Sequence, residues 1–173
     1  MSPAPLRPEP LEPDAFAPFG TVIRFDAASA RPVNEGTARR ADAAALFDAG
    51  LGARPRLALY RADAQALPLR ASLFERHPAA AQSFVSLSVP AFLVVVAPAG
   101  PDGGPDLGRA RAFVGSAGTG LSYRPDQWHT PIAALGTGGD LLMLTAEHGD
   151  ARDCVEHRLA EPLTILEPCL EPR

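Results

Sequence analysis

The chain has 173 residues, of which 46% are hydrophobic and 21% charged, and its formal net charge is -4. This length predicts one domain with a sizeable core, and the acidic balance argues against nucleic acid as a partner because phosphate binding needs a basic face. All 16 basic residues are arginine, which excludes a lysine Schiff base, covalent pyridoxal phosphate and a P-loop.

The two cysteines and the first residues bear on compartment and membranes. Cys154 and Cys169 have no CxxC spacing and no secretory context, which predicts a reducing, cytoplasmic setting. No apolar run approaches the ~20 residues needed to cross a bilayer, so no membrane partner is expected. Residues 1–13 are rich in proline and lack an apolar signal core. We expect an extended arm at 1–13, followed by a single domain at 14–173.

The first elements in chain order are short. Asp14 is expected to cap a turn that runs through Phe16 and ends at Gly20. A strand is expected at 21–25. The segment 41–47 is ambiguous, and its alanines favour helix. Alternation around two leucines predicts a strand at 56–61.

Residues 69–77 alternate with a period of two, which places one set of side chains on each face of a strand. One face would carry Leu69, Ala71, Leu73, Glu75 and His77, and the other Arg70, Ser72, Phe74 and Arg76. Polar groups on an apolar face cost free energy unless they are paired, bound to a ligand or exposed to a cavity. A functional role for this polar end is therefore expected.

Further strands are expected at 83–87, 92–97, 110–114, 121–124, 132–135, 140–145 and 163–166. Glycine and proline clusters at 98–105, 115–120 and 136–139 separate several of them. Many short strands with such turns predict an all-β sandwich or barrel.

Two motifs carry the candidate chemistry. The first runs from Glu75 through His77 to Gln82, and the second is the segment 123–131, which contains His129. A later strand can bring His129 to meet the first motif. Two imidazoles and a carboxylate suit proton transfer, or they can bind a divalent metal such as Zn, Fe, Ni or Mn, with the amide oxygen of Gln82 as a weak further ligand.

The spacing Glu75-x-His77-x4-Gln82, followed by one later histidine, is similar to the two motifs of the cupin superfamily. A closer resemblance, over roughly residues 14–160, is to the ureidoglycolate lyase family. It rests on the segments Phe19–Ile23, Ser83–Leu87, Phe92–Pro98, Pro105–Leu107, Tyr123-x4-Trp128-His129-x-Pro131 and Asp153-Cys154. The chain departs from the family pattern at Thr130, where a second histidine is usual.

The resemblance implies a cupin-like double-stranded β-helix (jelly-roll) barrel with few short helices, assembled as a homodimer. It also implies cleavage of ureidoglycolate to glyoxylate and urea in allantoin and purine breakdown, without an organic cofactor. In this reaction a base takes the hydroxyl proton, the C–N bond breaks and the urea nitrogen gains a proton. A bound metal could instead lower the pKa of the hydroxyl.

The expected catalytic residues are Glu75, His77 and His129. The expected substrate-binding residues are Gln82, Tyr123 and Trp128, with Trp128 as a pocket wall and Tyr123 as either a donor to the substrate or a space-filling side chain. The expected metal ligands, if a metal binds, are Glu75, His77, Gln82 and His129. Alternation turns Arg76 away from the pocket, towards a structural or dimer-contact role. His148, His157 and Cys154 are expected at the surface or in packing.

Two other functions remain open on the sequence. A set of two histidines and one carboxylate is also the ligand set of iron oxygenases, so a metal-dependent oxygenase or isomerase acting on another small hydroxy or ureido acid is one alternative. The other is a module that only binds a small acid. No basic helix or spare length exists for binding DNA.

Overall fold

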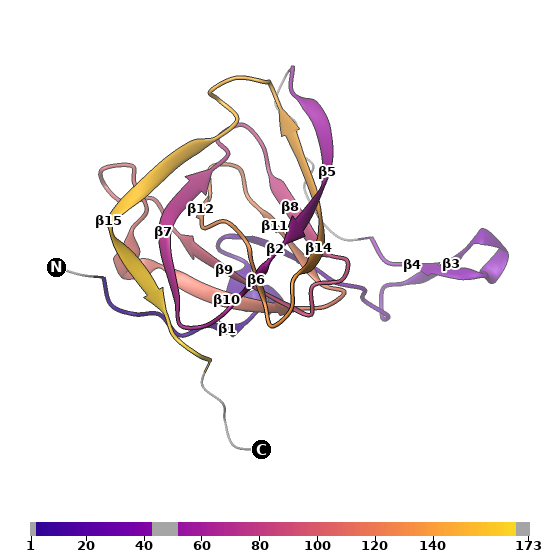
Figure 1. The fold of residues 1–173 in the computed structure, drawn as a ribbon. Helices are drawn as coiled ribbons and strands as arrows, with labels where there is room; N and C mark the ends of the chain where they lie inside the picture. Colours follow the sequence, from indigo (N-terminus) through magenta and orange to yellow (C-terminus); the bar gives the residue numbers. More distant parts are fainter. Residues whose placement is uncertain (1–2, 43–51, 169–173) are drawn as a thin grey trace.

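The computed structural model describes residues 3–42 and 52–168. Cys169 and most of the ambiguous segment 41–47 lie outside the described residues. The described chain contains an eight-stranded sheet, a five-stranded sheet and a two-stranded hairpin (Figure 1). The expected all-β barrel with few short helices is confirmed.

The helical elements are α1 (Pro13–Phe16) and the 3-10 turns η1 (Asn34–Gly36) and η2 (Leu107–Arg109). The strands are β1 (Glu9–Pro10), β2 (Gly20–Ile23), β3 (Arg31–Val33), β4 (Ala38–Arg40), β5 (Arg54–Ala62), β6 (Ala64–Gln65), β7 (Leu69–Arg76), β8 (Gln82–Ser86), β9 (Ala91–Ala97), β10 (Arg111–Ser116), β11 (Gly120–Tyr123), β12 (Trp128–His129), β13 (Ala133–Leu135), β14 (Gly139–Glu147) and β15 (Val155–Ile165).

The larger sheet runs in the order β1-β10-β9-β12-β7-β15, with β13 paired to β9 and β6 paired to β13. The smaller sheet runs in the order β2-β11-β8-β14-β5. The N-terminal arm joins the two ends of the larger sheet, because Leu6 forms a parallel bridge with Ile165 while β1 pairs with β10. This part of the arm is therefore in the barrel wall.

An inner hydrophobic cluster fills the space between the two sheets. Its buried members come from both sheets and from the N-terminal segment: Leu11, Phe16, Phe19, Phe84, Val89, Phe92, Val94, Val96, Phe113, Leu121, Tyr123, Ala134, Leu141 and Met143. A second cluster lies on the other side of the larger sheet and contains Phe74, Leu93, Val95, Ala97, Ala110, Ala112, Trp128, Leu163 and Ile165. Strand β9 contributes alternate residues to each cluster, which explains its continuous apolar sequence.

The structure corrects two local predictions. Helix α1 begins at Pro13, and its N-cap residue is Glu12, which makes no side-chain capping bond; Asp14 lies in the first turn and is not the cap. In β7, Leu69 and Ala71 pack against the second cluster, to which Phe74 also belongs. The predicted alternation is therefore interrupted between Ala71 and Phe74. The pairing register between β7 and β15 is irregular at the same place.

Two elements were not predicted at their full extent. Strand β15 begins at Val155, well before the expected start at residue 163. Its first half alternates half-buried and exposed residues at the edge of the sheet. No apolar run in the sequence therefore marks it as a strand. The β3–β4 hairpin projects away from the barrel (Figure 1), and none of its residues belongs to either cluster.

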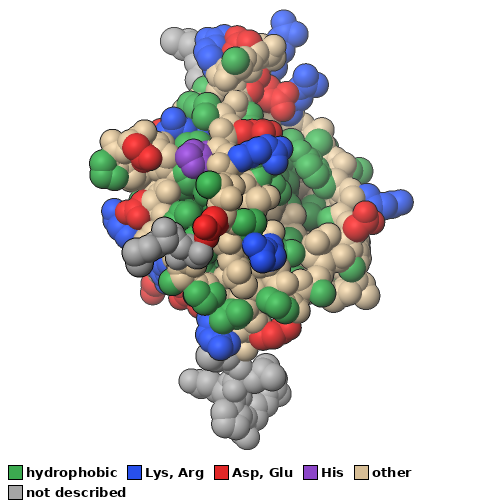
Figure 2. All heavy atoms as spheres, turned by 60° about the vertical axis from the view of Figure 1, so that its left-hand side comes forward, with side chains coloured by type: hydrophobic (Ala, Val, Ile, Leu, Met, Phe, Trp, Pro, Cys, Tyr) green, Lys and Arg blue, Asp and Glu red, His purple; other side chains and the backbone are tan. Residues whose placement is uncertain are grey.

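The surface carries both signs of charge. Figure 2 shows acidic and basic side chains interspersed over the face that it displays, with no extended basic patch. Leu57, Leu59 and Leu87 are more than half exposed on the outside of the smaller sheet. Among the described residues, no helix is long and apolar enough to span a bilayer.

Candidate active site

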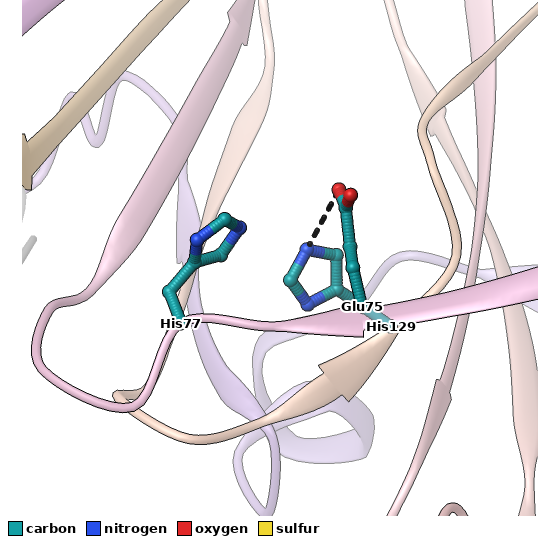
Figure 3. Close-up of side chains that lie close together, drawn as sticks. All are labelled: Glu75, His77 and His129. Carbon is teal, nitrogen blue, oxygen red and sulfur yellow. Dashed lines mark ion pairs between the residues drawn. The ribbon is translucent and has the colours of Figure 1, made fainter. Parts of the chain in front are cut away.

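Three predicted residues meet on the inner face of the larger sheet. Glu75 lies near the end of β7, His77 follows that strand, and His129 ends β12. His129 is the register partner of both Glu75 and Val96. Because Val96 belongs to the inner cluster, Glu75 and His129 face the barrel interior. Figure 3 shows the two histidine rings and the carboxylate turned to the same side of the ribbon.

The distances within this group are short. His129 Nε2 lies 3.5 Å from a carboxylate oxygen of Glu75 and 3.2 Å from the amide oxygen of Gln82. The ring centroids of His77 and His129 are 5.5 Å apart. One ligand atom from each of Glu75, His77 and His129 lies within 4.8 Å of the others. The structure therefore brings together the three residues that the two motifs predict.

Backbone carbonyls set the tautomer of both histidines. His77 Nδ1 lies 2.6 Å from the carbonyl oxygen of Asp153, and His129 Nδ1 lies 2.8 Å from that of Gln127. A carbonyl oxygen can only accept, so each Nδ1 carries the proton and donates it. Nε2 of each ring is then the atom left to bind a proton or a cation. His77 Nε2 is buried and has no hydrogen-bond partner among the described residues.

These donor atoms fit a divalent cation. Two Nε2 lone pairs and a carboxylate converge, and both imidazoles donate their other nitrogen to a carbonyl, the usual support for a metal-binding histidine. Around His129 Nε2, two oxygen acceptors from Glu75 and Gln82 face the nitrogen. A proton on Nε2 or a bound cation satisfies all three atoms. The arrangement can therefore move a proton or hold a metal.

The surroundings shift the pKa values of the group. A hydrogen bond from His129 is the main cause that lowers the pKa of Glu75, and the charges of both histidines act in the same direction against burial. Burial is the main cause that lowers the pKa of His77. At neutral pH, Glu75 is therefore an anion and His77 a neutral base.

Two predicted binding residues stand beside His129. Gln82 is 5% exposed on β8 and contacts His129 Nε2. Tyr123 stacks on the His129 ring with the centroids 3.9 Å apart and the planes inclined by 14°. Within the described part of the chain its hydroxyl is buried without a hydrogen-bond partner, and burial raises the pKa of Tyr123 well above its usual value. The tyrosine therefore stays protonated and has a hydrogen-bond donor to offer.

Trp128 lies on the opposite face of the sheet from His129. It belongs to the second cluster, and its indole Nε1 donates to the carbonyl of Gly103. The guanidinium of Arg76 lies 4.6 Å from the centre of a Trp128 ring and pairs with Asp126. The expected pocket wall at Trp128 is therefore not where the three residues converge, and Arg76 takes the structural position that alternation predicts. His157, which meets Trp128 edge to face, belongs to this same packing layer.

Asp153 supports the site and was not singled out as a site residue in the sequence. Its carboxylate accepts hydrogen bonds from the backbone N–H groups of His148, Gly149 and Asp150, at 2.7, 2.6 and 3.1 Å. The loop shaped in this way directs the Asp153 carbonyl onto His77 Nδ1. The available sequence signal was the Asp153-Cys154 pair, together with the turn residues that precede it.

Thr130 is buried next to His129 in the chain. Its N–H donates to the carbonyl of Val95, and its hydroxyl accepts from the N–H of the same residue. Thr130 and Leu73 also line a cavity of about 410 Å³ between β7 and the segment 130–134. Glu75, His77 and His129 are not among the residues that line this cavity.

Comparison with known proteins identifies relatives. A family model described as Ureidoglycolate lyase matches residues 3–166. The chain is 40% identical over 163 residues to a ureidoglycolate lyase of Burkholderia mallei, with 94% of each chain covered, and 39% identical over 160 residues to one of Rhizobium etli, covering 92% of this chain and 94% of the relative. A dTDP sugar isomerase structure from Desulfovibrio desulfuricans G20 is similar with a TM-score of 0.49 and 15% identity, covering 82% of this chain and 84% of that one.

Proposed function

The chain belongs to the ureidoglycolate lyase family, and we propose that it cleaves the C–N bond of ureidoglycolate to give glyoxylate and urea in allantoin catabolism. The observation that carries this proposal is the inward-facing group of Glu75, His77 and His129, with all three donor atoms within 4.8 Å. The reaction needs one group that accepts a proton and one that donates a proton, and no redox or organic cofactor.

His77 and His129 can each carry out one of the two proton transfers. The buried Nε2 of His77 accepts the hydroxyl proton of the substrate: the lowered pKa keeps the ring neutral, and no described residue occupies the Nε2 lone pair. The carbon–oxygen double bond of glyoxylate then forms as the C–N bond breaks. A proton held at His129 Nε2, next to the Glu75 carboxylate, passes to the leaving nitrogen to complete urea.

Gln82 and Tyr123 are proposed to position the substrate. Gln82 holds His129 Nε2 in place and can also contact the ureido group. The unpartnered hydroxyl of Tyr123 can donate a hydrogen bond to a substrate oxygen. Stacking of Tyr123 on His129 keeps that imidazole in one orientation. We assign Trp128 a packing role instead of a substrate contact, because it lies on the other face of the sheet.

A second form of the proposal places a divalent metal such as Ni, Zn, Mn or Fe on Glu75, His77 and His129, with Gln82 beside them. A metal bound there would supply Lewis acidity that lowers the pKa of the substrate hydroxyl. The two carbonyls on the Nδ1 atoms would then serve to orient both imidazoles.

The test is to incubate the purified protein with racemic ureidoglycolate, with and without a chelator, while following glyoxylate and urea. Equal amounts of both products, formed faster than in a buffer control, are the expected result. Loss of activity on chelation, with recovery on adding back one metal, selects the metal-assisted form. Absence of turnover in both metal-free and metal-loaded protein rejects the proposed reaction.

The set of two histidines and one carboxylate supports one alternative, a metal-dependent oxygenase or isomerase acting on a related small acid. Bound iron in the purified protein and consumption of oxygen with substrate would favour that alternative. Turnover of ureidoglycolate without oxygen uptake would favour the lyase.

We also propose that the enzyme is a cytoplasmic homodimer. The free thiol of Cys154 is exposed, which suits a reducing compartment. Leu57, Leu59 and Leu87 form an apolar surface on the outside of the smaller sheet, and a second copy would bury it.

A further inference from the structure

We propose that Arg56, near the start of β5, binds the carboxylate of the substrate. The inference rests on the proposed function, since ureidoglycolate carries one carboxylate. It adds a specificity-determining residue outside both sequence motifs, on a strand of the smaller sheet.

The neighbours of Arg56 show which way it faces. Ala58 and Ala62, at alternate positions of β5, pack against the inner cluster. Tyr60 meets the inner-cluster residue Phe84 edge to face, with ring centroids 5.7 Å apart. Side chains two apart on a strand share a face. Arg56 therefore lies on the barrel-facing side of β5.

The strand register sets Arg56 level with the site. Tyr123 pairs with Gln82 across β11 and β8, and Arg56 pairs with Thr145 across β5 and β14. The β14–β8 register, continued by one residue, brings Thr145 beside Gln82, and the Thr145 hydroxyl donates to the carbonyl of Ala81. These residues form one row across the smaller sheet. At ~4.8 Å between strands, Arg56 stands ~10 Å from Gln82 along the sheet, within reach of a small acid and a long side chain.

A hollow lies beside Arg56, at the β5 end of this row of residues. It has a volume of about 480 Å³ and is lined by Gly52, Arg54, Pro55, Arg56, Glu147, His148 and Gly149. Its lining therefore contains two guanidinium groups and one carboxylate, which gives it a net positive charge. The Arg56 side chain is 63% exposed, so a solute can reach its guanidinium.

Glu147 orients Arg56 by accepting a hydrogen bond from Nε at 2.7 Å. That contact occupies one edge of the guanidinium, and the outer edge, formed by the two terminal amino groups, suits bidentate binding of a second carboxylate. Glu147 belongs to the same part of the smaller sheet as Arg56. It lies on β14 two residues after Thr145, which pairs with Arg56 in the row described above.

Arg61 provides a matched control on the same strand. It also pairs with a carboxylate of β14, through Nε to Asp140 at 2.8 Å, and it is also exposed. Arg61 is five residues from Arg56 on the same strand, so alternation turns it to the outer face of the sheet, away from the barrel interior. Loss of this arginine should leave the proposed site intact.

The experiment compares Arg56→Gln, Arg56→Lys and Arg61→Gln with the parent enzyme in steady-state cleavage of ureidoglycolate. We expect Arg56→Gln to raise KM by about 10- to 100-fold with kcat within about 3-fold, the size of a lost charge-assisted pair of hydrogen bonds. Arg56→Lys should recover part of the loss, and Arg61→Gln should behave as the parent. An unchanged KM in Arg56→Gln, or an equal effect in Arg61→Gln, would overturn the proposal.

Binding of glyoxylate, followed by calorimetry, separates this inference from the proposed reaction. If the parent protein turns over ureidoglycolate, the KM values decide the role of Arg56. If it does not, weaker glyoxylate binding in Arg56→Gln than in Arg61→Gln still supports a carboxylate site. Equal glyoxylate affinities in both variants, or no binding to the parent protein, reject it.

Discussion

His129 is constrained on three sides at the scale of single residues. Gln127 holds Nδ1, Tyr123 covers the ring, and Gln82 and Glu75 face Nε2. The residue is only 1% exposed, so these contacts replace water almost entirely. A buried imidazole held in this way has one orientation and one reactive atom, which is what proton transfer or metal binding needs.

Substitutions in the inward-facing group should therefore abolish most activity. We expect His77→Ala, His129→Ala and Glu75→Gln each to lower kcat by at least ~10²-fold, the size of a lost acid–base contribution. Glu75→Gln keeps the volume and removes the charge. Steady-state kinetics on folded protein, checked by circular dichroism, measures the effect.

Arg76→Ala is the control for these three variants. Arg76 packs on Trp128 and pairs with Asp126 on the other face of β7. Its loss should lower thermal stability while the folded fraction keeps its kcat. If the Arg76→Ala variant were folded but inactive while the His129→Ala variant stayed active, the substrate would bind on the face of β7 that carries Arg76. That result would contradict the site described above.

Asp153 offers a test of positioning. Asp153→Ala removes the acceptor of three backbone N–H groups, so the carbonyl that holds His77 Nδ1 should shift. We expect kcat to fall about 10- to 100-fold, the usual cost of losing such support. Nitrogen NMR of the imidazoles should show His77 losing its single Nδ1–H tautomer.

Asp150→Asn is the matched control in the same loop. Asp150 pairs with Arg152 at the surface and makes no contact with His77 among the described interactions. Its variant should retain the His77 tautomer and activity. A normal His77 spectrum in Asp153→Ala would show that the loop does not set the tautomer.

At the scale of elements, β9 and β7 differ in how far sequence periodicity describes them. Strand β9 is buried on both faces, so its run of apolar residues predicts a strand without assigning either face. Strand β7 changes face between Ala71 and Phe74, where its pairing with β15 becomes irregular. Alternation still holds from Phe74 to Arg76, the part of the strand that places Glu75.

The arm is an element whose importance can be measured. Leu6 donates to the carbonyl of Thr164 at 2.9 Å, accepts from Leu166 at 2.8 Å and packs against the second cluster. Deleting residues 1–8 should lower the free energy of unfolding by roughly 2–4 kcal/mol, through the two lost backbone hydrogen bonds of Leu6, the lost bond from Arg7 to the Glu167 carbonyl and lost apolar burial. Urea unfolding measures the change.

A substitution in the β3–β4 hairpin serves as the comparison. Glu35 has a positive φ of 56°, which glycine adopts without strain, and the hairpin belongs to neither cluster. Glu35→Gly should change the free energy of unfolding by less than ~0.5 kcal/mol. Equal stability of the truncated and full-length chains would mean that the arm does not close the barrel.

At the scale of the whole molecule, the prediction concerns the oligomeric state. The chain has a mass of 18.1 kDa, and we expect sedimentation velocity at micromolar concentration to give twice that value. The physical reason is the exposed aliphatic surface on the smaller sheet, which costs free energy in water. A single species at the monomer mass would contradict the proposed homodimer.

The sequence by itself determined the all-β class, most strand positions, the family and the three residues of the inward-facing group. These follow from short-range periodicity, turn residues and motif spacing, which are local properties of the chain. Adjacent positions on one strand also face opposite ways, so the pair Trp128-His129 already contained the information that Trp128 lies outside the site.

The tertiary structure alone decided which distant atoms meet. Strand pairing set His129 beside Glu75, the loop after β14 brought the Asp153 carbonyl to His77, and the register of the smaller sheet aligned Arg56 with Gln82. Such contacts depend on register and closure of the barrel, which are set by packing across the whole core and leave no local pattern in the sequence.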